Sequence, residues 1–258
     1  MGKISALTLL LAAILLFRGY SLWNYSQSPN IGDFYTYWAG AKYAKEHPSP
    51  FIYDEEAKED VSRWCSGPES GFDEELRQKS EGFYFYNTQS PLAYALLSSL
   101  SSGNYWQDLS TFKAASFLSV AAALILSLWF FGFGINASLI MLNFIIYLYD
   151  PLRSDIGTGN AACLELGLLT LSILPLASGK KFSYALSGFM LAFLLLLKAN
   201  IAFAPLFWLA SMAVTGRKRE LKETMAGGAL GAALGLLWGG SFFGEASIWI
   251  DWAKRIIS

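Results

Sequence analysis

The sequence predicts an all-α polytopic membrane protein with about seven transmembrane helices and a large, helical first extracytoplasmic loop. Three observations predict this class. Of the 258 residues, 54% are hydrophobic and 15% are charged, whereas soluble domains contain roughly 25% charged residues. The stretch from Ala114 to Tyr149 contains no charged residue. The later apolar segments lack the charged face of a helix at the surface of a soluble protein.

The apolar segments give the positions of the spans, because a membrane-crossing helix needs about 20 mostly apolar residues. The charge-free stretch is too long for one helix, and glycines at 132 and 134 interrupt it, so we expect two helices joined by a turn. The first segment is also typical of a signal peptide, but no Ala-x-Ala-like cleavage site follows Phe17, so we expect an uncleaved helix. We expect a single membrane domain over residues 1–258, with spans at about 4–22, 109–132, 135–150, 157–178, 182–198, 199–215 and 224–243.

The basic residues of the short loops predict the orientation, because Lys and Arg are enriched in cytoplasmic loops. The densest basic cluster lies at 217–222 and the next at Lys180 and Lys181. With both clusters in the cytoplasm, the N-terminus with Lys3 is also inside. Residues 23–108, the turn at 151–156 and the tail at 244–258 are then outside.

The first outer loop, residues 23–108, is the only sizeable polar segment. It contains 13 acidic and 6 basic residues. We expect helices at 35–47 and 54–65, which Pro and Gly residues separate. The apolar segment Pro91–Leu100 is too short to span a bilayer, so we expect a helix lying at the outer interface.

Ionisable residues near the membrane are candidate functional groups, because charge is costly in lipid. Asp33 follows the first span and lies among aromatic residues. Its carboxylate suits a general base that takes a proton from a hydroxyl. The alternative is that Asp33 merely caps the 35–47 helix.

Further charged residues admit a structural and a functional interpretation. Arg153 and Asp155 lie in the 151–156 turn and are either solvated loop residues or site residues. Glu165 lies two turns into the fourth span, where it forms either a structural interhelical bond or part of a site. Lys198 and Arg18 lie at the outer ends of spans and either reach the lipid headgroups or hold a phosphate.

These residues together suit one kind of substrate. Cations at the outer membrane face suit a phosphate, and the aromatic rings of the outer loop suit stacking on sugars and isoprenoid chains. A ligand with a lipid tail, a phosphate and a sugar would satisfy every feature. We see no Gly-rich phosphate loop for a nucleotide, no requirement for a metal, although Asp150 and Asp155 leave one possible, and no basic field for nucleic acid.

Four short motifs follow one another along the chain. They are Gly32-Asp33-Phe34-Tyr35-Thr36-Tyr37-Trp38 with Pro50-Phe51-Ile52-Tyr53, then Phe83-Tyr84-Phe85-Tyr86 with Ser90-Pro91-Leu92, then Gly157-Thr158-Gly159-Asn160, and Lys198 followed by Pro205-Leu206 and Gly216-Arg217-Lys218-Arg219. In their order and spacing they resemble the polyprenyl-phosphate-mannose-dependent mannosyltransferase branch of the GT-C superfamily of integral-membrane glycosyltransferases. The sequence departs from the family at Thr158, where the family usually has Gln. The chain also stops at Ser258, where family members continue with further helices.

The resemblance implies a GT-C-like core module and an inverting glycosyltransferase. In this enzyme Asp33 is the catalytic base, and Lys198, Arg153, Asn160, Tyr35 and Tyr86 contact substrate, with Asp155, Glu165 and Arg18 as further candidates. A sugar, mannose or a related hexose or pentose, passes from a polyprenyl-phosphate donor to a hydroxyl of a glycan or glycolipid. No cofactor is implied, and a divalent metal is left open.

The resemblance also implies a place in the cell: the plasma membrane of a bacterium or archaeon, with the active site on its extracytoplasmic face. Other interpretations stay open. The chain could instead be a non-catalytic membrane subunit or lipid-phosphate binder, or one half of a split enzyme whose partner chain supplies the missing helices. A transporter is a weaker third option, because no pair of broken helices stands in matching halves of the sequence. The glycines of 227–240 offer a close-packing face to such a partner or to another helix of this chain.

Overall fold

The structure is a computed structural model that describes residues 5–26, 32–47, 50–81, 85, 88–178 and 182–257. Within these residues every regular element is a helix, with thirteen α-helices, three short 3-10 helices and no strand. The predicted all-α class is therefore confirmed. The chain divides into two compact units: unit 1 comprises Met1–Phe34 and Asn104–Leu171, and unit 2 comprises Tyr35–Gly103 and Ser172–Ser258. The expectation of one domain over 1–258 stays a prediction.

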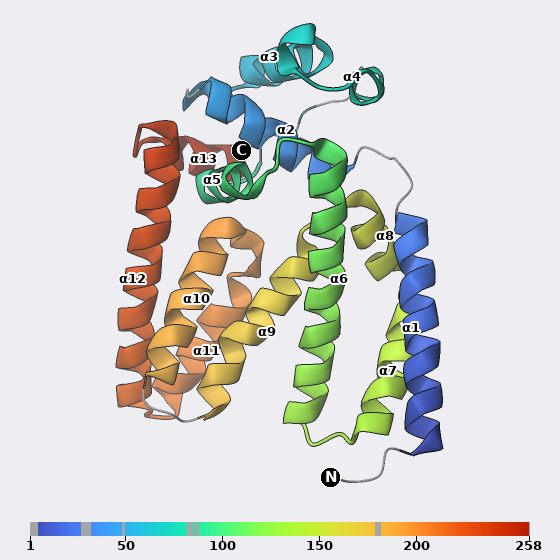
Figure 1. The fold of residues 1–258 in the computed structure, drawn as a ribbon. Helices are drawn as coiled ribbons and strands as arrows, with labels where there is room; N and C mark the ends of the chain where they lie inside the picture. The colour runs from blue at the N-terminus through green and yellow to red at the C-terminus, as the bar shows by residue number, and fades with distance from the viewer. Residues whose placement is uncertain are drawn as a thin grey trace. The chain divides into compact units, whose positions relative to one another are not determined.

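Unit 1 is built from apolar helices that pack on one another. Its helices are α1 (Ala6–Ser26), α6 (Tyr105–Phe130), α7 (Ile135–Leu148), α8 (Asp150–Thr158) and the first turns of α9 (Ala162–Ser178). Helix α7 packs against both α1 and α6, and α8 packs against α1, α6 and α7 (Figure 1). The side chains that form the core are Leu22, Val120, Ile146, Leu152, Ile156 and Cys163.

Two breaks shape unit 1. Gly132 has φ +77° in the turn between α6 and α7, a left-handed conformation that glycine adopts without strain. At Tyr149 the chain bends by 69° between α7 and α8. Pro151 stands in the first turn of α8, where its missing N–H costs no helical hydrogen bond. The segment 151–156 is therefore a helix, and the predicted loop conformation of this turn is wrong.

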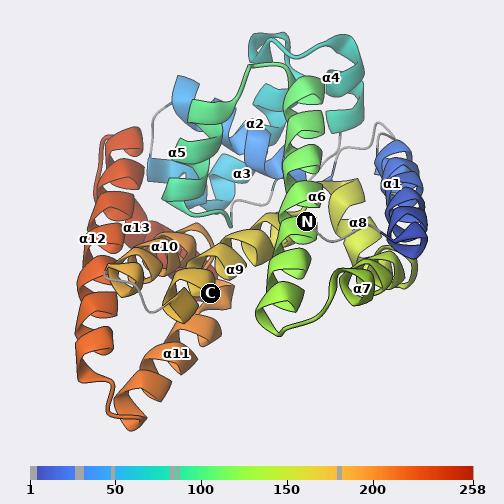
Figure 2. The same ribbon diagram turned by 60° about the horizontal axis from the view of Figure 1, so that its bottom comes forward.

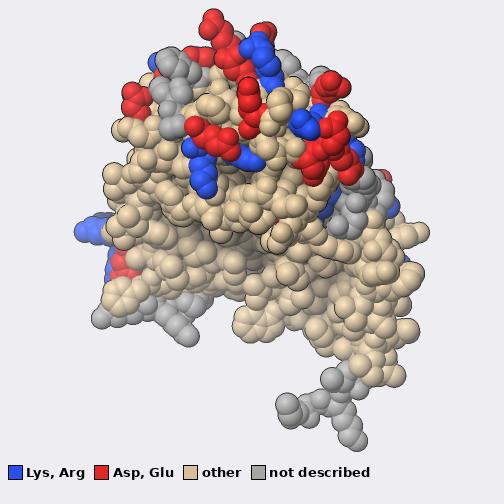
Figure 3. Space-filling view, turned by 45° about the horizontal axis from the view of Figure 1, so that its top comes forward, with Lys and Arg blue, Asp and Glu red and all other residues tan. Residues whose placement is uncertain are grey.

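Unit 2 combines the helices of the polar loop with the C-terminal apolar helices. Its elements are α2 (Asp33–Glu46) from Tyr35 onward, η1 (Pro50–Tyr53), α3 (Glu55–Ser66), η2 (Pro68–Ser70), α4 (Glu74–Ser80), α5 (Pro91–Leu100), the end of α9 from Ser172 onward, α10 (Ser183–Leu197), η3 (Ala199–Ile201), α11 (Phe203–Val214), α12 (Lys218–Phe243) and α13 (Ile248–Ile257). Charged side chains gather over the loop helices, which include α3 and α4 (Figure 3). One cluster joins the loop to the C-terminal helices, with Ala41, Ala44, Ile52, Tyr53, Tyr94, Phe243 and Ile248 as its buried members.

Small residues let α10 and α12 approach closely (Figure 1). A Cβ atom added at Gly188 would lie 1.9 Å from the carbonyl oxygen of Thr224, and one at Gly227 would lie 1.9 Å from that of Ala185. Gly231 meets the backbone of Phe189 in the same way, at 2.4 Å. The N-terminal part of the glycine face of α12 is thus occupied by a helix of the same chain.

Three helices are long and apolar enough to cross a membrane: α1, α6 and α12. The bent pair of α7 and α8 makes a fourth if it is one span. Helices α9, α10 and α11 are apolar but have 17, 15 and 12 residues. At a rise of about 1.5 Å per residue they are shorter than a hydrocarbon core of about 30 Å. Three to four candidate spans are therefore present among the described residues.

The helix bounds lie close to the predicted ones for most apolar segments, as α6 at 105–130 and α10 at 183–197 illustrate. The 157–178 segment differs, because Gly159–Ala161 separates α8 from α9, and α9 begins only at Ala162. The tail at 244–258 contains the unforeseen amphipathic helix α13, and the loop contains the unforeseen helix α4.

Candidate functional site

The predicted base Asp33 meets the predicted substrate contact Asn160 within unit 1. The amide Nδ2 of Asn160 donates a hydrogen bond to Oδ2 of Asp33 at 2.7 Å, across 127 residues of sequence. The hydroxyl of Thr158 donates to the same oxygen at 3.4 Å. Because both donors address Oδ2, they hold the carboxylate in one orientation. Asp33 is the first residue of α2, so its charge also faces the positive end of the helix dipole.

Glycine allows the two backbone segments of this site to touch. A Cβ atom at Gly159, which has φ +72°, would lie 2.5 Å from Cβ of Phe34. One at Gly32 would lie 2.6 Å from the carbonyl oxygen of Thr158. Phe34 itself is buried and lies 4.7 Å from the ring of Phe112, measured between ring centroids. The Gly-Asp-Phe and Thr-Gly-Asn motifs are thus packed against each other, with the two polar side chains at their contact.

Besides its bond to Asp33, Asn160 forms hydrogen bonds with the ends of the two helices that flank it. Its Oδ1 accepts a hydrogen bond from the backbone N–H of Ala162 at 3.0 Å, which supports the start of α9. Its own backbone N–H donates to the carbonyl of Asp155 at 2.8 Å, which closes the end of α8. Asn160 therefore lies between two helices, whereas the sequence analysis placed it inside the fourth span. It connects their ends to the carboxylate of Asp33.

Two of the predicted cations line one pocket of unit 1. Arg18 of α1 and Arg153 of α8 line a cavity of about 390 Å³, together with Tyr147 of α7. Figure 2 shows α7 and α8 beside α1. Nη1 of Arg18 donates to the carbonyl of Asn143 at 2.7 Å, and the guanidinium lies 4.5 Å from the ring centroid of Tyr147. A guanidinium has five N–H donors, so Arg18 retains donors beyond this backbone bond. The lining contains no acidic residue, which suits an anion.

A second pocket of unit 1 is mostly apolar. It has a volume of about 360 Å³ and is lined by side chains of α6 to α9, with the half-buried Asp155 as its acidic member. Sγ of Cys163 lies 4.0 Å from Oδ2 of Asp155. Apolar walls with one polar group are typical of small-molecule sites. This pocket suits a hydrocarbon chain beside a polar group.

The other predicted site residues lie elsewhere. Tyr35 is 2% exposed in unit 2, so its ring belongs to the core and offers a substrate no surface. Tyr86 lies outside the described residues. Lys198 is half-buried at the C-terminal end of α10 in unit 2, as predicted for the end of that segment. Glu165 lies in the first turn of α9, where helix dipoles favour a carboxylate, and its predicted place two turns into a span is wrong.

Three contributors to the site could not be named from the sequence. Tyr147 and the carbonyl of Asn143 orient Arg18, and Thr158 assists Asn160. The only signal for Thr158 was its place in the Gly-Thr-Gly-Asn motif. Among the described residues, no group of three or more His, Cys, Asp or Glu side chains could hold a metal ion.

Comparison of the chain with protein-family models, with curated proteins and with solved structures gives no match. The function therefore has to be argued from the site itself.

Proposed function

We propose that this chain is an inverting glycosyltransferase that moves a sugar, mannose or a related hexose or pentose, from a polyprenyl-phosphate donor to a hydroxyl of a glycan or glycolipid. The observation that carries the proposal is the hydrogen bond from Asn160 to Asp33. It unites two motifs that the resemblance assigns to one active site. The arginine pocket and the apolar pocket of the same unit supply complementary surfaces for a phosphate and a lipid chain.

The proposed reaction is a single displacement. Asp33 accepts the proton of the acceptor hydroxyl while the hydroxyl oxygen forms a bond to the anomeric carbon of the sugar. The bond from that carbon to the phosphate oxygen breaks, and its electron pair leaves with the polyprenyl phosphate. Arg153 and Arg18 stabilise the negative charge that develops on this leaving group.

The membrane arrangement is part of the same proposal. Seven segments cross the bilayer in this arrangement. The shorter helices α9, α10 and α11 cross it because their flanking residues extend the span or because the bilayer is locally thinner. The N-terminus lies in the cytoplasm, and residues 23–108 lie outside the plasma membrane, within the cell envelope of a bacterium or archaeon. The donor then reaches Asp33 from the outer leaflet.

Donor binding tests the proposal. The chain, purified into lipid nanodiscs, is incubated with polyprenyl-phosphate mannose, and the affinity is measured for wild type and for Arg153→Ala. Arg153 is exposed, so its truncation spares the core. A lost charge-assisted hydrogen bond of about 1.5–3 kcal/mol predicts a dissociation constant roughly 10- to 150-fold higher.

The matched control is Arg63→Ala, which removes an exposed arginine that pairs with Asp60 of the same helix, α3, at 3.1 Å. We expect wild-type affinity from this variant. Absence of binding by wild type, or equal affinity in Arg153→Ala, contradicts the proposed donor site.

A further inference from the structure

A polar pocket of unit 2 takes no part in the proposed transfer reaction. Its volume is about 370 Å³, within the range of roughly 300–1,000 Å³ that small-molecule sites occupy. One wall is α2, with Lys42, Lys45 and Glu46, and the other is the end of α5 with the segment Ser98–Gly103. Within this loop of 13 acidic and 6 basic residues, two of the six cations line one cavity.

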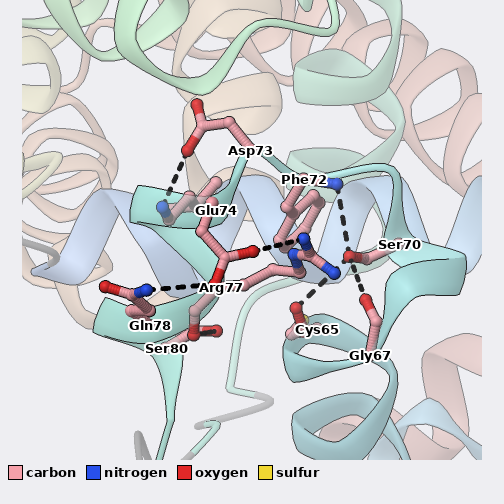
Figure 4. A network of polar contacts seen from close by, with 10 residues as sticks. Cys65, Gly67, Ser70, Phe72, Asp73, Glu74, Arg77, Gln78 and Ser80 are labelled. Carbon is pink, nitrogen blue, oxygen red and sulfur yellow. Dashed lines mark hydrogen bonds and ion pairs between the residues drawn. The ribbon is translucent and has the colours of Figure 1, made fainter.

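Lys42 is held in place by its surroundings. Its Nζ donates to the carbonyl of Ser70 at 2.8 Å and lies 4.9 Å from the ring centroid of Phe72. Ser70 is itself fixed, because its hydroxyl bonds to the carbonyls of Cys65 and Gly67 (Figure 4). An ammonium has three donors, and Ser70 uses one. The charge of Lys42 is therefore positioned before any ligand arrives, which lowers the entropic cost of binding.

The opposite wall presents hydroxyl groups. Oγ of Ser101 accepts hydrogen bonds from Nε1 of Trp38 and from the backbone N–H of Gly103, both at 3.1 Å. These two bonds fix the serine oxygen against α2. Ser98 and Ser102 add hydroxyls to the same lining. The wall thus offers several groups that both donate and accept.

Lys45 and Glu46 add one positive and one negative charge to the pocket lining. Both are exposed, and neither side chain forms an ion pair or a hydrogen bond with another described residue. Two ammonium groups suit an oxyanion. The carboxylate of Glu46 would repel a bare anion but would accept hydrogen bonds from hydroxyl groups. A ligand that carries both an anionic group and several hydroxyls satisfies both walls.

We infer that this pocket binds an anionic sugar, such as a uronic acid or a sugar phosphate, with Lys42 and Lys45 on its anionic group and with Glu46 and the serines on its hydroxyls. The site is independent of the proposed transfer reaction, because every lining residue belongs to unit 2 and Asp33 belongs to unit 1. Its test accordingly measures binding alone.

The test compares four probes: glucose 6-phosphate, glucuronate, glucose and inorganic phosphate. Equilibrium dialysis with the full chain in nanodiscs gives each dissociation constant for wild type, Lys45→Ala and Lys79→Ala. Lys79 is the matched control, because it lies in the same unit on α4 and pairs with Glu75 at 2.7 Å. We expect wild type to bind both anionic sugars more tightly than glucose or phosphate, and more weakly at high salt.

In Lys45→Ala the dissociation constants for glucose 6-phosphate and glucuronate should rise roughly tenfold, as for one charge-assisted contact. In Lys79→Ala they should be unchanged. Failure of wild type to bind either anionic sugar, equal affinity for inorganic phosphate, unchanged affinity in Lys45→Ala, or an equal loss in Lys79→Ala would each overturn the inference.

Discussion

At the scale of single residues, the site depends on a glycine as much as on its polar groups. Gly159 has φ +72°, and its missing Cβ leaves room for Phe34. Asn160 follows directly and reaches Asp33. Any side chain at 159 would therefore push apart the two segments that position the carboxylate.

We predict that Gly159→Ala lowers stability by about 2–5 kcal/mol, since it adds left-handed strain of roughly 1–2 kcal/mol to an overpacking cost of about 1–3 kcal/mol. Gly132→Ala is the matched control, because Gly132 has φ +77° but no atom within 4 Å of its added Cβ. This control isolates the strain alone. Melting temperatures in detergent measure both variants, and equal shifts would show that Phe34 does not constrain position 159.

The sequence identified the polar residues of the site one by one, but not their contact. Asp33 and Asn160 stood out through their motifs, yet they lie 127 residues apart, and only the tertiary structure joins them. The sequence likewise singled out Arg18 and Arg153 separately, without the pocket that they share. The burial of Tyr35 could not be foreseen either, because an aromatic motif does not reveal which of its rings turn inward.

At the scale of elements, the contact between α10 and α12 depends on the register of adjacent glycines. Gly227 faces the backbone of Ala185, where an added Cβ would lie 1.9 Å from the carbonyl oxygen. At the next residue, Gly228, an added Cβ would lie 3.6 Å from its nearest neighbour, the carbonyl oxygen of Gly188. The methyl group of an alanine would therefore clash at position 227 but would fit at position 228 of the same helix.

We predict that Gly227→Ala destabilises the protein by about 1–3 kcal/mol through overpacking. Gly228→Ala should be neutral or stabilising by up to about 1 kcal/mol, because Ala favours a helix interior over Gly. Unfolding in a denaturing detergent series compares the two. Similar behaviour of both variants would mean that α10 does not occupy this face of α12, which would then be open to a partner chain.

The apolar helices were predictable because a long charge-free segment has few stable conformations other than a membrane or core helix. Their bounds follow from the flanking charged residues and glycines. Three amphipathic or polar helices were not predicted. Helix α8 contains three charges in nine residues and was taken for a loop, although Pro151 near its start and Gly159 at its end are helix-boundary signals. Helix α4 begins with Asp73, whose side chain accepts from the N–H of Leu76 at 2.7 Å. Helix α13 buries Ile248 but exposes Ile250. An amphipathic pattern of this kind is difficult to detect in the sequence of a short segment.

At the scale of the whole molecule, the proposed orientation in the membrane rests on the basic clusters of the sequence. We predict that Ser102→Cys and Lys222→Cys, each in a background with Cys65 and Cys163 replaced by Ala, react with a membrane-impermeant maleimide from opposite sides. Both positions are exposed in the structure. Labelling from the same side would contradict the proposed orientation.

Cys65 provides an internal control for this experiment in the wild-type chain. Burial raises the pKa of its thiol to about 12, and the thiolate is the form that reacts with maleimide. We predict that Cys65 stays unmodified at pH 8 in the folded protein and reacts after denaturation. Rapid labelling of native Cys65 would show that the loop core opens readily, and would weaken any topology drawn from the engineered positions.

The proposed role of Asp33 is to remove a proton from the acceptor hydroxyl, and the rate of sugar transfer by Asp33→Asn measures this role. Asn keeps the size of Asp and suits the start of a helix nearly as well, but it cannot accept a proton at neutral pH. Transfer from polyprenyl-phosphate mannose, donor affinity and melting temperature are measured on one preparation. We predict transfer about 10²–10⁴-fold slower, the usual contribution of a general base, with donor affinity unchanged and a stability loss of no more than about 1 kcal/mol, because the charge at the start of α2 is lost. Wild-type transfer by a well-folded Asp33→Asn variant would contradict the account.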